Sequence, residues 1–214
     1  MITSVRHVAL VSWKPTATAE QIRTAQKAFP GFVPHMKGLI GFHVSPALEN
    51  SPDGYADWHF GYISDFASIE DFKAYQADPM HTEYGIKYVH AARQDSRRVQ
   101  YLCEGSTHKG GGSMVRHLTV IQWQGGAAGD AIKAAQAALA DAARGAKGSL
   151  GFSGGPNLNI DLRPDLNWDY AAVADFRDLD AYHAYRKSTA FTEADQRIAA
   201  VRQASHGVVC QWPM

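Results

Sequence analysis

The stretch VRHVALVSW, residues 5–13, occurs a second time as VRHLTVIQW, residues 115–123. A second pair, KGLIGF at residues 37–42 and KGSLGF at residues 147–152, has the same offset of 110 residues. The offset also aligns two aromatic pairs without a gap: Trp58 with Trp168, and Tyr75 with Tyr185. Self-similarity at a fixed period is the sequence signature of a repeated structural unit. The chain of 214 residues therefore contains two copies of one domain.

The segment EGSTHKGGGSM, which begins at residue 104, separates the two copies and is rich in glycine and polar residues. Such a composition is typical of a flexible linker. We therefore predict a first domain at residues 1–103, a linker at 104–113 and a second domain at 114–214. A linker of this length allows the two domains to pack against each other.

Each copy shows the order strand, helix, strand, strand, helix, strand. Residues 5–13 alternate and are rich in β-branched and aromatic side chains, which favours a strand. Thr18 and Gln21 form a capping-box pattern at the start of the first helix. Asp78 and Pro79 end one short helix and begin another, because proline is tolerated at the first helical position. The remaining strands are predicted at residues 39–45, 58–64 and 98–103.

This βαββαβ order is that of the ferredoxin-like fold, an α+β class in which helices cover one face of a four-stranded sheet. The other face of each sheet must be buried, and the second copy is the obvious cover. We therefore predict two ferredoxin-like repeats packed sheet to sheet, which gives an intramolecular α+β barrel with a central cavity.

Composition excludes several function classes. The chain has 21 basic and 21 acidic residues, without a long run of either sign, which argues against nucleic-acid binding. No window approaches the roughly 18–20 apolar residues of a membrane span, and the amino terminus lacks a signal-peptide pattern. Two cysteines give no disulfide framework, so a cytoplasmic protein is expected.

Three segments resemble the stress-responsive A/B barrel (Dabb) family of the dimeric α+β barrel superfamily. They are VRH at the start of the first strand, SDFASIEDFKAYQADPMH at residues 64–81, and VQYLC at residues 99–103. The resemblance covers nearly all of the first copy. The second copy keeps VRH and ADFRDLDAYHAY but then loses both the proline and the histidine.

Within this family, the first copy is similar to the plant polyketide cyclase that forms olivetolic acid. The resemblance implies that Tyr75 and His81 form an acid/base pair and that His7 supports them in the same pocket. A strand-three histidine of that cyclase falls on Phe60 here, so this part of the pocket differs. The resemblance implies chemistry without a cofactor.

Strand alternation groups His7 with Ala9, Val11 and Trp13, and we expect this set to line the space between the two sheets. Val8 and Leu10 would then pack beneath the helices. The expected substrate-binding lining consists of Trp13, Trp58, Phe60 and His43, with Tyr62 beside them. Such a lining suits a small hydrophobic or aromatic molecule.

A histidine and a tyrosine in such a cavity could move a proton next to a carbonyl, which supports cyclase, isomerase or lyase chemistry. The same residues could instead be packing residues of a non-catalytic, ligand-binding or oligomeric barrel, and a cofactor-free monooxygenase is a third reading. The ten histidines show no H-x-x-x-H or H-E-x-x-H spacing, so no metal site is predicted. Whether the chain forms a homo-oligomer is left open.

Overall fold

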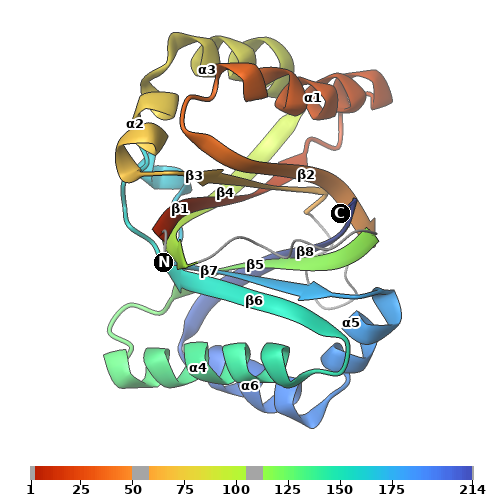
Figure 1. The fold of residues 1–214 in the computed structure, drawn as a ribbon, viewed down its shortest axis with the longest axis vertical. Helices are drawn as coiled ribbons and strands as arrows, with labels where there is room; N and C mark the ends of the chain where they lie inside the picture. Colours follow the sequence, from red (N-terminus) through yellow and green to blue (C-terminus); the bar gives the residue numbers. More distant parts are fainter. Residues whose placement is uncertain (1–2, 50–57, 105–112, 214) are drawn as a thin grey trace.

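The computed structural model describes residues 3–49, 58–104 and 113–213 (Figure 1). The first repeat consists of β1 (Thr3–Trp13), α1 (Ala19–Phe32), β2 (Leu39–Glu49), β3 (Phe60–Phe66), α2 (Ile69–Ala77), α3 (Pro79–Tyr84) and β4 (Arg93–Glu104). The second consists of β5 (Ser113–Trp123), α4 (Gly129–Gly145), β6 (Ser149–Pro156), β7 (Tyr170–Phe176), α5 (Leu179–Arg186), α6 (Thr189–Ala199) and β8 (Arg202–Pro213). The predicted βαββαβ order is present in both repeats. Most of the predicted linker lies outside the described residues.

Side-chain caps fix the helix boundaries that the sequence indicated. The Thr18 hydroxyl accepts a hydrogen bond from the backbone N–H of Gln21, and the Gln21 side chain accepts one from the Thr18 N–H, as in a capping box. The Asp78 carboxylate accepts a hydrogen bond from the Met80 N–H at 2.9 Å and caps α3. The break between α2 and α3 therefore places His81 on the first turn of a new helix.

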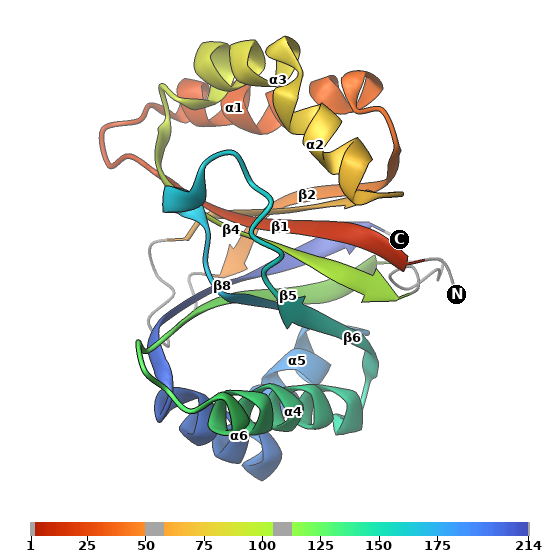
Figure 2. The same cartoon turned by 90° about the vertical axis from the view of Figure 1, so that its left-hand side faces the viewer.

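All eight strands belong to one sheet with the order β4-β1-β3-β2-β8-β5-β7-β6. The repeats are joined where β2 pairs with β8, with Ala47 opposite Cys210. Near the other edge, the chain that follows β6 reaches β4: the Leu158 N–H donates to the Gln100 carbonyl at 2.7 Å. The sheet thus curls so that its two halves face each other, with α1–α3 outside one half and α4–α6 outside the other (Figures 1 and 2).

The space between the two halves of the sheet is tightly packed. Aliphatic and aromatic side chains from both repeats form one cluster there, including Val8, Leu10, Leu118, Val120 and Val208. Gly61 shows how closely the layers approach. A Cβ atom on Gly61 would lie 2.7 Å from Leu118 Cδ1 and 2.8 Å from Val208 Cγ2. The prediction of two repeats packed sheet to sheet is confirmed.

The expected assignment of the two faces of β1 is wrong. Val8 and Leu10 lie between the sheets, whereas Ala9, Val11 and Trp13 face the helices of the first repeat. Both faces of β1 are buried, so both carry apolar side chains, and a period of two cannot tell one face from the other. On β2, Phe42 and Val44 pack beneath the helices of the first repeat.

Each repeat holds a buried ion pair at the same place. Arg6 donates to both carboxylate oxygens of Asp65 at 2.7 Å, and Arg116 pairs with Asp175 in the same way. Arg6 also donates to the Ser153 hydroxyl of the other repeat at 2.7 Å. Paired buried charges fix geometry, because breaking such a pair leaves an uncompensated charge.

In the described parts of the chain, none of the helices combines the length and the apolar character needed to cross a membrane.

Candidate active site in the first repeat

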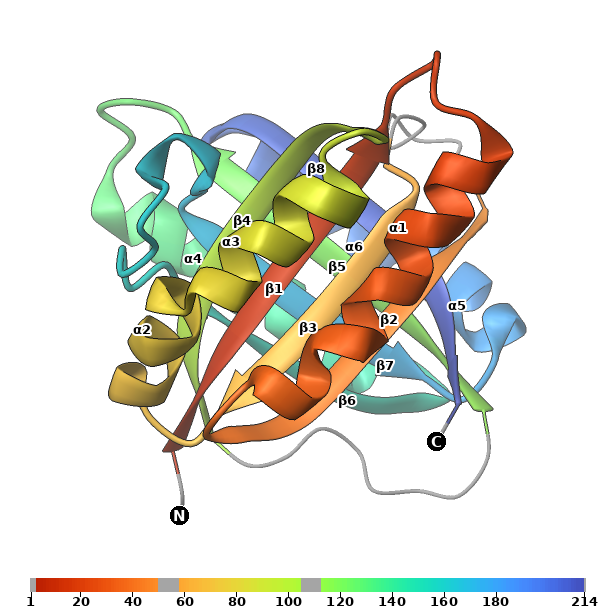
Figure 3. The ribbon, with the colours of Figure 1, turned by 90° about the horizontal axis from the view of Figure 1, so that it is seen from above.

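A cavity of about 210 Å³ lies between the helices and the sheet of the first repeat. Figure 3 shows α1 and α3 lying across β1, β3 and β2. Residues of these helices and strands line the cavity, which is partly open. Its apolar wall is made of residues from α1 and the segment after it, from the sheet, and from the end of α3 and the chain that follows: Val11, Ala28, Phe29, Phe32, Met36, Phe42, Tyr84 and Val89. The predicted cavity between the two sheets is therefore replaced by one on the opposite, helix-covered face.

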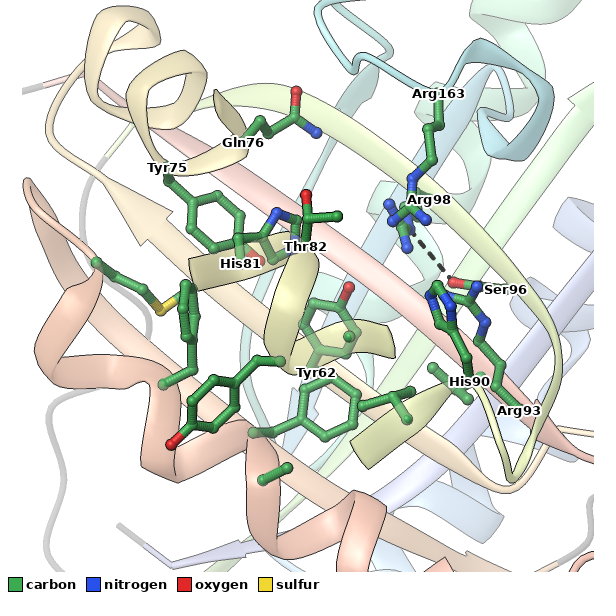
Figure 4. Close-up of a pocket in the computed structure, with 18 of the residues that line it drawn as sticks. Tyr62, Tyr75, Gln76, His81, Thr82, His90, Arg93, Ser96, Arg98 and Arg163 are labelled. Carbon is green, nitrogen blue, oxygen red and sulfur yellow. Dashed lines mark hydrogen bonds between the residues drawn. The ribbon is translucent and has the colours of Figure 1, made fainter. Parts of the chain in front are cut away.

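Tyr75 and His81 lie together on one wall of this cavity (Figure 4). Their ring centres are 4.3 Å apart, and Phe32 packs on both rings at 5.8 and 5.7 Å. Tyr75 comes from the last turns of α2 and His81 from the first turn of α3. The break at Asp78 thus turns the two side chains toward the same space.

The surroundings set the protonation states of this pair. Burial, together with the positive charges of Arg98 and Arg163, lowers the pKa of His81 to about 4, although a hydrogen bond that the imidazole donates to the Gln76 backbone carbonyl acts in the opposite direction. Burial raises the pKa of Tyr75 above its ordinary value. Near pH 7 the pair is therefore a neutral imidazole, which can accept a proton, beside a phenol that can donate a hydrogen bond.

His7 lies behind the cavity wall and is 2% exposed. The Gln100 side-chain amide nitrogen lies 2.9 Å from His7 Nδ1 and 3.3 Å from an Asp161 carboxylate oxygen. Because an amide NH₂ must face the carboxylate, the same group donates to Nδ1, and the His7 proton is left on Nε2. His7 Nε2 then donates to the Tyr62 hydroxyl at 3.3 Å.

Through these hydrogen bonds, His7 orients the hydroxyl group of Tyr62. Burial, with Arg98 as the next cause, lowers the pKa of His7 to about 3, so the ring stays neutral. Tyr62 lines the cavity, and its hydroxyl oxygen accepts from His7. Its own proton is therefore available to a ligand. Tyr62 joins Tyr75 as a hydrogen-bond donor at the cavity.

Opposite this pair, the cavity wall carries three arginines, Arg93, Arg98 and Arg163 (Figure 4). Arg98 projects from β4 and is 4% exposed. Its guanidinium lies 3.7 Å from an Asp161 oxygen and 3.4 Å from the Ser96 hydroxyl.

Asp161, Leu162 and Arg163 come from the second repeat, in the connection between β6 and β7. The Leu162 N–H donates to the Gln76 side chain at 3.1 Å, and the Arg163 N–H donates to Asp161 at 2.8 Å. These bonds hold the connection against the end of α2. The site is thus built from both repeats.

The residues expected to bind substrate are divided between two places. Trp13 and Phe60 pack against each other at 5.7 Å on the helix-covered face, and Phe29 of the cavity wall rests on Phe60 at 5.0 Å. Trp58 lies instead in the cluster between the sheets, and His43 contacts Trp212 there at 5.3 Å. None of these four residues lines the cavity of the first repeat, so the expected substrate-binding lining is wrong.

The second repeat lacks counterparts of His81, Arg98 and Gln100. At the position of His81 it has Phe191, which packs edge-on against Tyr185 at 4.9 Å. The strand register places Gly207 opposite Thr119 where the first repeat has Arg98 opposite Ala9, and Val209 opposite His117 where it has Gln100 opposite His7. Apolar side chains of α4, α5 and α6 fill the helix-covered face.

Sequence reasoning missed the arginines, although one signal for them was present. Residues 96, 98 and 100 alternate as Ser, Arg and Gln in the last strand of the first copy, and the register-matched residues of the second are Ser, Gly and Val. That difference marks a polar face that only the first copy has. No group of three or more His, Cys, Asp or Glu placed to hold a metal ion occurs among the residues described.

Comparisons with known proteins agree with this architecture. An anthrone oxidase-like protein superposes with a TM-score of 0.67 at 13% identity, covering 99% of this chain and 92% of that chain. A candidate monooxygenase of Fusobacterium nucleatum gives 0.62 at 9% identity, covering 99% and 93%. One of Lactobacillus acidophilus gives 0.54 at 13% identity, covering 97% and 93%. At identities this low, the superpositions show a shared fold and nothing more.

No curated protein is similar enough in sequence to count as a relative. The model of the stress responsive A/B barrel domain family, Dabb, matches residues 5–102, which span the first repeat from β1 to β4. The matched region contains Tyr75, His81, His7 and Arg98. The match to the Dabb family thus covers the first repeat, somewhat less than half of the chain.

Proposed function

We propose that the protein is a cofactor-independent acid/base enzyme acting on a small aromatic or polyketide-like carbonyl compound bound in the cavity of the first repeat. The observation that carries this proposal is the contact between His81 and Tyr75 on one cavity wall, with the imidazole neutral and the phenol protonated. Cyclases, isomerases and lyases of this kind share one first step, the removal of a proton next to a carbonyl.

In this step the free nitrogen of His81 takes the proton from carbon, and the electron pair of the C–H bond becomes the enolate. Tyr75 and Tyr62 donate hydrogen bonds to the enolate oxygen, where negative charge develops. The imidazolium then returns its proton to carbon or to a leaving oxygen. The step needs no external oxidant or reductant.

The asymmetry of the repeats supports a catalytic rather than a packing role for His81. Phe191 shows that an apolar ring is accepted at this position of the fold. Packing therefore does not require a histidine at this position. The first repeat keeps this histidine together with a cavity, whereas the second has phenylalanine within a packed core.

Proton exchange tests the proposal without knowledge of the natural substrate. A panel of aryl β-diketones and aryl ketones in D₂O should show enzyme-dependent deuterium uptake next to the carbonyl, measured by proton NMR. His81→Gln should lower the rate about 100-fold or more, with the melting temperature nearly unchanged. His183→Gln, on α5 of the second repeat, should leave it unaltered. Exchange that survives His81→Gln would contradict the assignment.

The same panel separates the two other candidate functions. A barrel that only binds ligands would shift ligand resonances without any deuterium uptake in wild type. A cofactor-free monooxygenase would consume dissolved oxygen with phenols or anthrones, which an oxygen electrode detects. Neither outcome is expected.

A further inference from the structure

The cavity has a surplus of positive charge. Arg93, Arg98 and Arg163 line it, and among the described lining residues Asp161 is the one carboxylate. Asp161 lies near Arg98 at 3.7 Å. No carboxylate in the described parts of the chain lies within salt-bridge distance of Arg93 or Arg163. Two guanidinium groups therefore border a largely apolar cavity without an acidic partner.

The pKa values of two of these arginines reflect the excess of positive charge. Burial, followed by repulsion from Arg98, lowers the pKa of both Arg93 and Arg163. Partly buried cations that repel one another destabilise the empty protein unless an anion offsets them. Such a cluster is expected where an anionic ligand completes the charge balance.

We propose that Arg98 and Arg163, with Arg93 beside them, bind the carboxylate of the substrate. The substrate class is thus a carboxylic acid with an aromatic or alkyl body. This inference deepens the proposed function, on which the placement of the substrate carbonyl at His81 rests. A guanidinium holds a carboxylate through two parallel hydrogen bonds in one plane, a geometry that an amide or ester cannot match.

The shape of the cavity supports this orientation. Figure 4 shows Arg93, Arg98 and Arg163 across the cavity from His81 and Tyr75. The apolar ring of Phe32 packs on both His81 and Tyr75. An apolar body packed against the phenylalanines, with its carboxylate at the arginines, brings the intervening carbons past His81. A β- or γ-keto acid has its acidic C–H bonds in this part of the molecule.

An anion in the cluster also changes the base. The charges of Arg98 and Arg163 contribute to the low pKa of His81. A carboxylate between them offsets those charges and raises that pKa toward the ordinary value of about 6.5. A substrate with the right charge therefore makes His81 a stronger base, and a neutral analogue does not.

In this proposal, the second repeat contributes to the anion site of the first. Arg163 lies in its β6–β7 connection, which hydrogen bonds hold against α2 and β4. Gly207 stands at the register position of Arg98, so the second repeat lacks an equivalent cation on its own last strand. One repeat thus contains the cavity, and the other contributes part of its anion site.

Isothermal titration with a matched pair of probes, 3-phenylpropanoate and 3-phenylpropanamide, tests the proposal on the full chain. The acid should bind about 10- to 100-fold more tightly than the amide, the range expected for charge-assisted hydrogen bonds. Arg163→Gln should remove most of this preference and leave the amide affinity unchanged. Arg93→Gln, a second variant, should reduce it. The exposed Arg177→Gln should have no effect.

Equal binding of acid and amide by wild type, or a preference that survives both Arg163→Gln and Arg93→Gln, would overturn the proposal. Tighter binding of phenyl phosphate than of the carboxylate would also overturn it, in favour of a phosphate ester. The variant His81→Gln should keep the preference for the acid. If it does, and His81→Gln leaves proton exchange untouched, the proposed function fails while the anion site stands.

Discussion

The imidazole of His81 lies against the ring of Tyr75, with their centres 4.3 Å apart and both exposed to the same cavity. The repeat supplies a natural comparison, because Tyr185 occurs in the second copy with a phenylalanine in place of the histidine. The two tyrosines share a place in the fold but differ in what they face.

This comparison yields a matched pair of variants. Tyr75→Phe removes a phenol that faces the cavity, and we expect deuterium exchange to fall about 100-fold, in the range of acid/base groups. Tyr185→Phe makes the same change in the packed second repeat, and exchange should be unaltered. Equal losses for the two variants would mean that Tyr75 acts through stability alone, which melting temperatures would reveal.

The hydrogen bond from His7 to the Tyr62 hydroxyl predicts a coupled effect on stability. Tyr62→Phe leaves a buried N–H without its acceptor and should cost about 1–3 kcal/mol. His7→Phe removes the donor. The double variant should cost less than the sum of the two, by about 0.5 kcal/mol or more, in urea unfolding. Strict additivity would show that the two side chains do not interact.

Two buried histidines, His7 and His117, and the half-buried His81 predict how stability depends on pH. The pKa values of His7 and His117 are lowered to about 3, mainly by burial, and that of His81 to about 4. The unfolded chain therefore binds protons between about pH 6.5 and 4 that the folded chain does not. The free energy of unfolding should fall as the pH drops through this window and be insensitive to these groups above it.

Each such histidine contributes a slope of up to about 1.4 kcal/mol per pH unit. Urea unfolding at pH 7, 6 and 5, followed by circular dichroism, measures the total. His81→Gln should reduce the slope between pH 6 and 5 by up to one such share. An unfolding free energy that rises on acidification across this window would contradict the assignment of neutral, buried rings.

Two strand glycines test the packing of the sheets. A Cβ at Gly61 would meet two side chains of the opposite layer at 2.7 and 2.8 Å, whereas a Cβ at Gly151 meets no atom within 4 Å. Gly61→Ala should therefore cost about 1–3 kcal/mol, the usual range for an overpacked core. Gly151→Ala should be neutral or slightly stabilising. Thermal unfolding of the pair measures the difference.

The fold could be predicted from the sequence because its strongest signals are local or repeated. The recurrence of VRH and KG-x-x-GF revealed two copies, and the caps at Thr18 and Asp78 marked helix starts that the structure contains. Periodicity then gave the strand order of one copy. Each of these signals depends on residues close together in the chain.

The site was harder to predict because it depends on contacts between distant residues. The face of β1 could not be assigned, since Val8 and His7 both point into buried layers. Arg163 lies in the other repeat, and its approach to Arg98 follows from the way the sheet curls. The Tyr75–His81 pair itself was accessible only because a helix break brings nearby residues together.

The connection at residues 157–169 crosses from the second repeat to β4 and brings Arg163 to the cavity of the first. The two copies therefore differ: the first contains the cavity, and the second supplies part of its wall. An artificial chain made of two copies of the first repeat would have two cavities, and neither would have the guanidinium group that Arg163 supplies. Duplication has here produced a cavity wall that neither half could form alone.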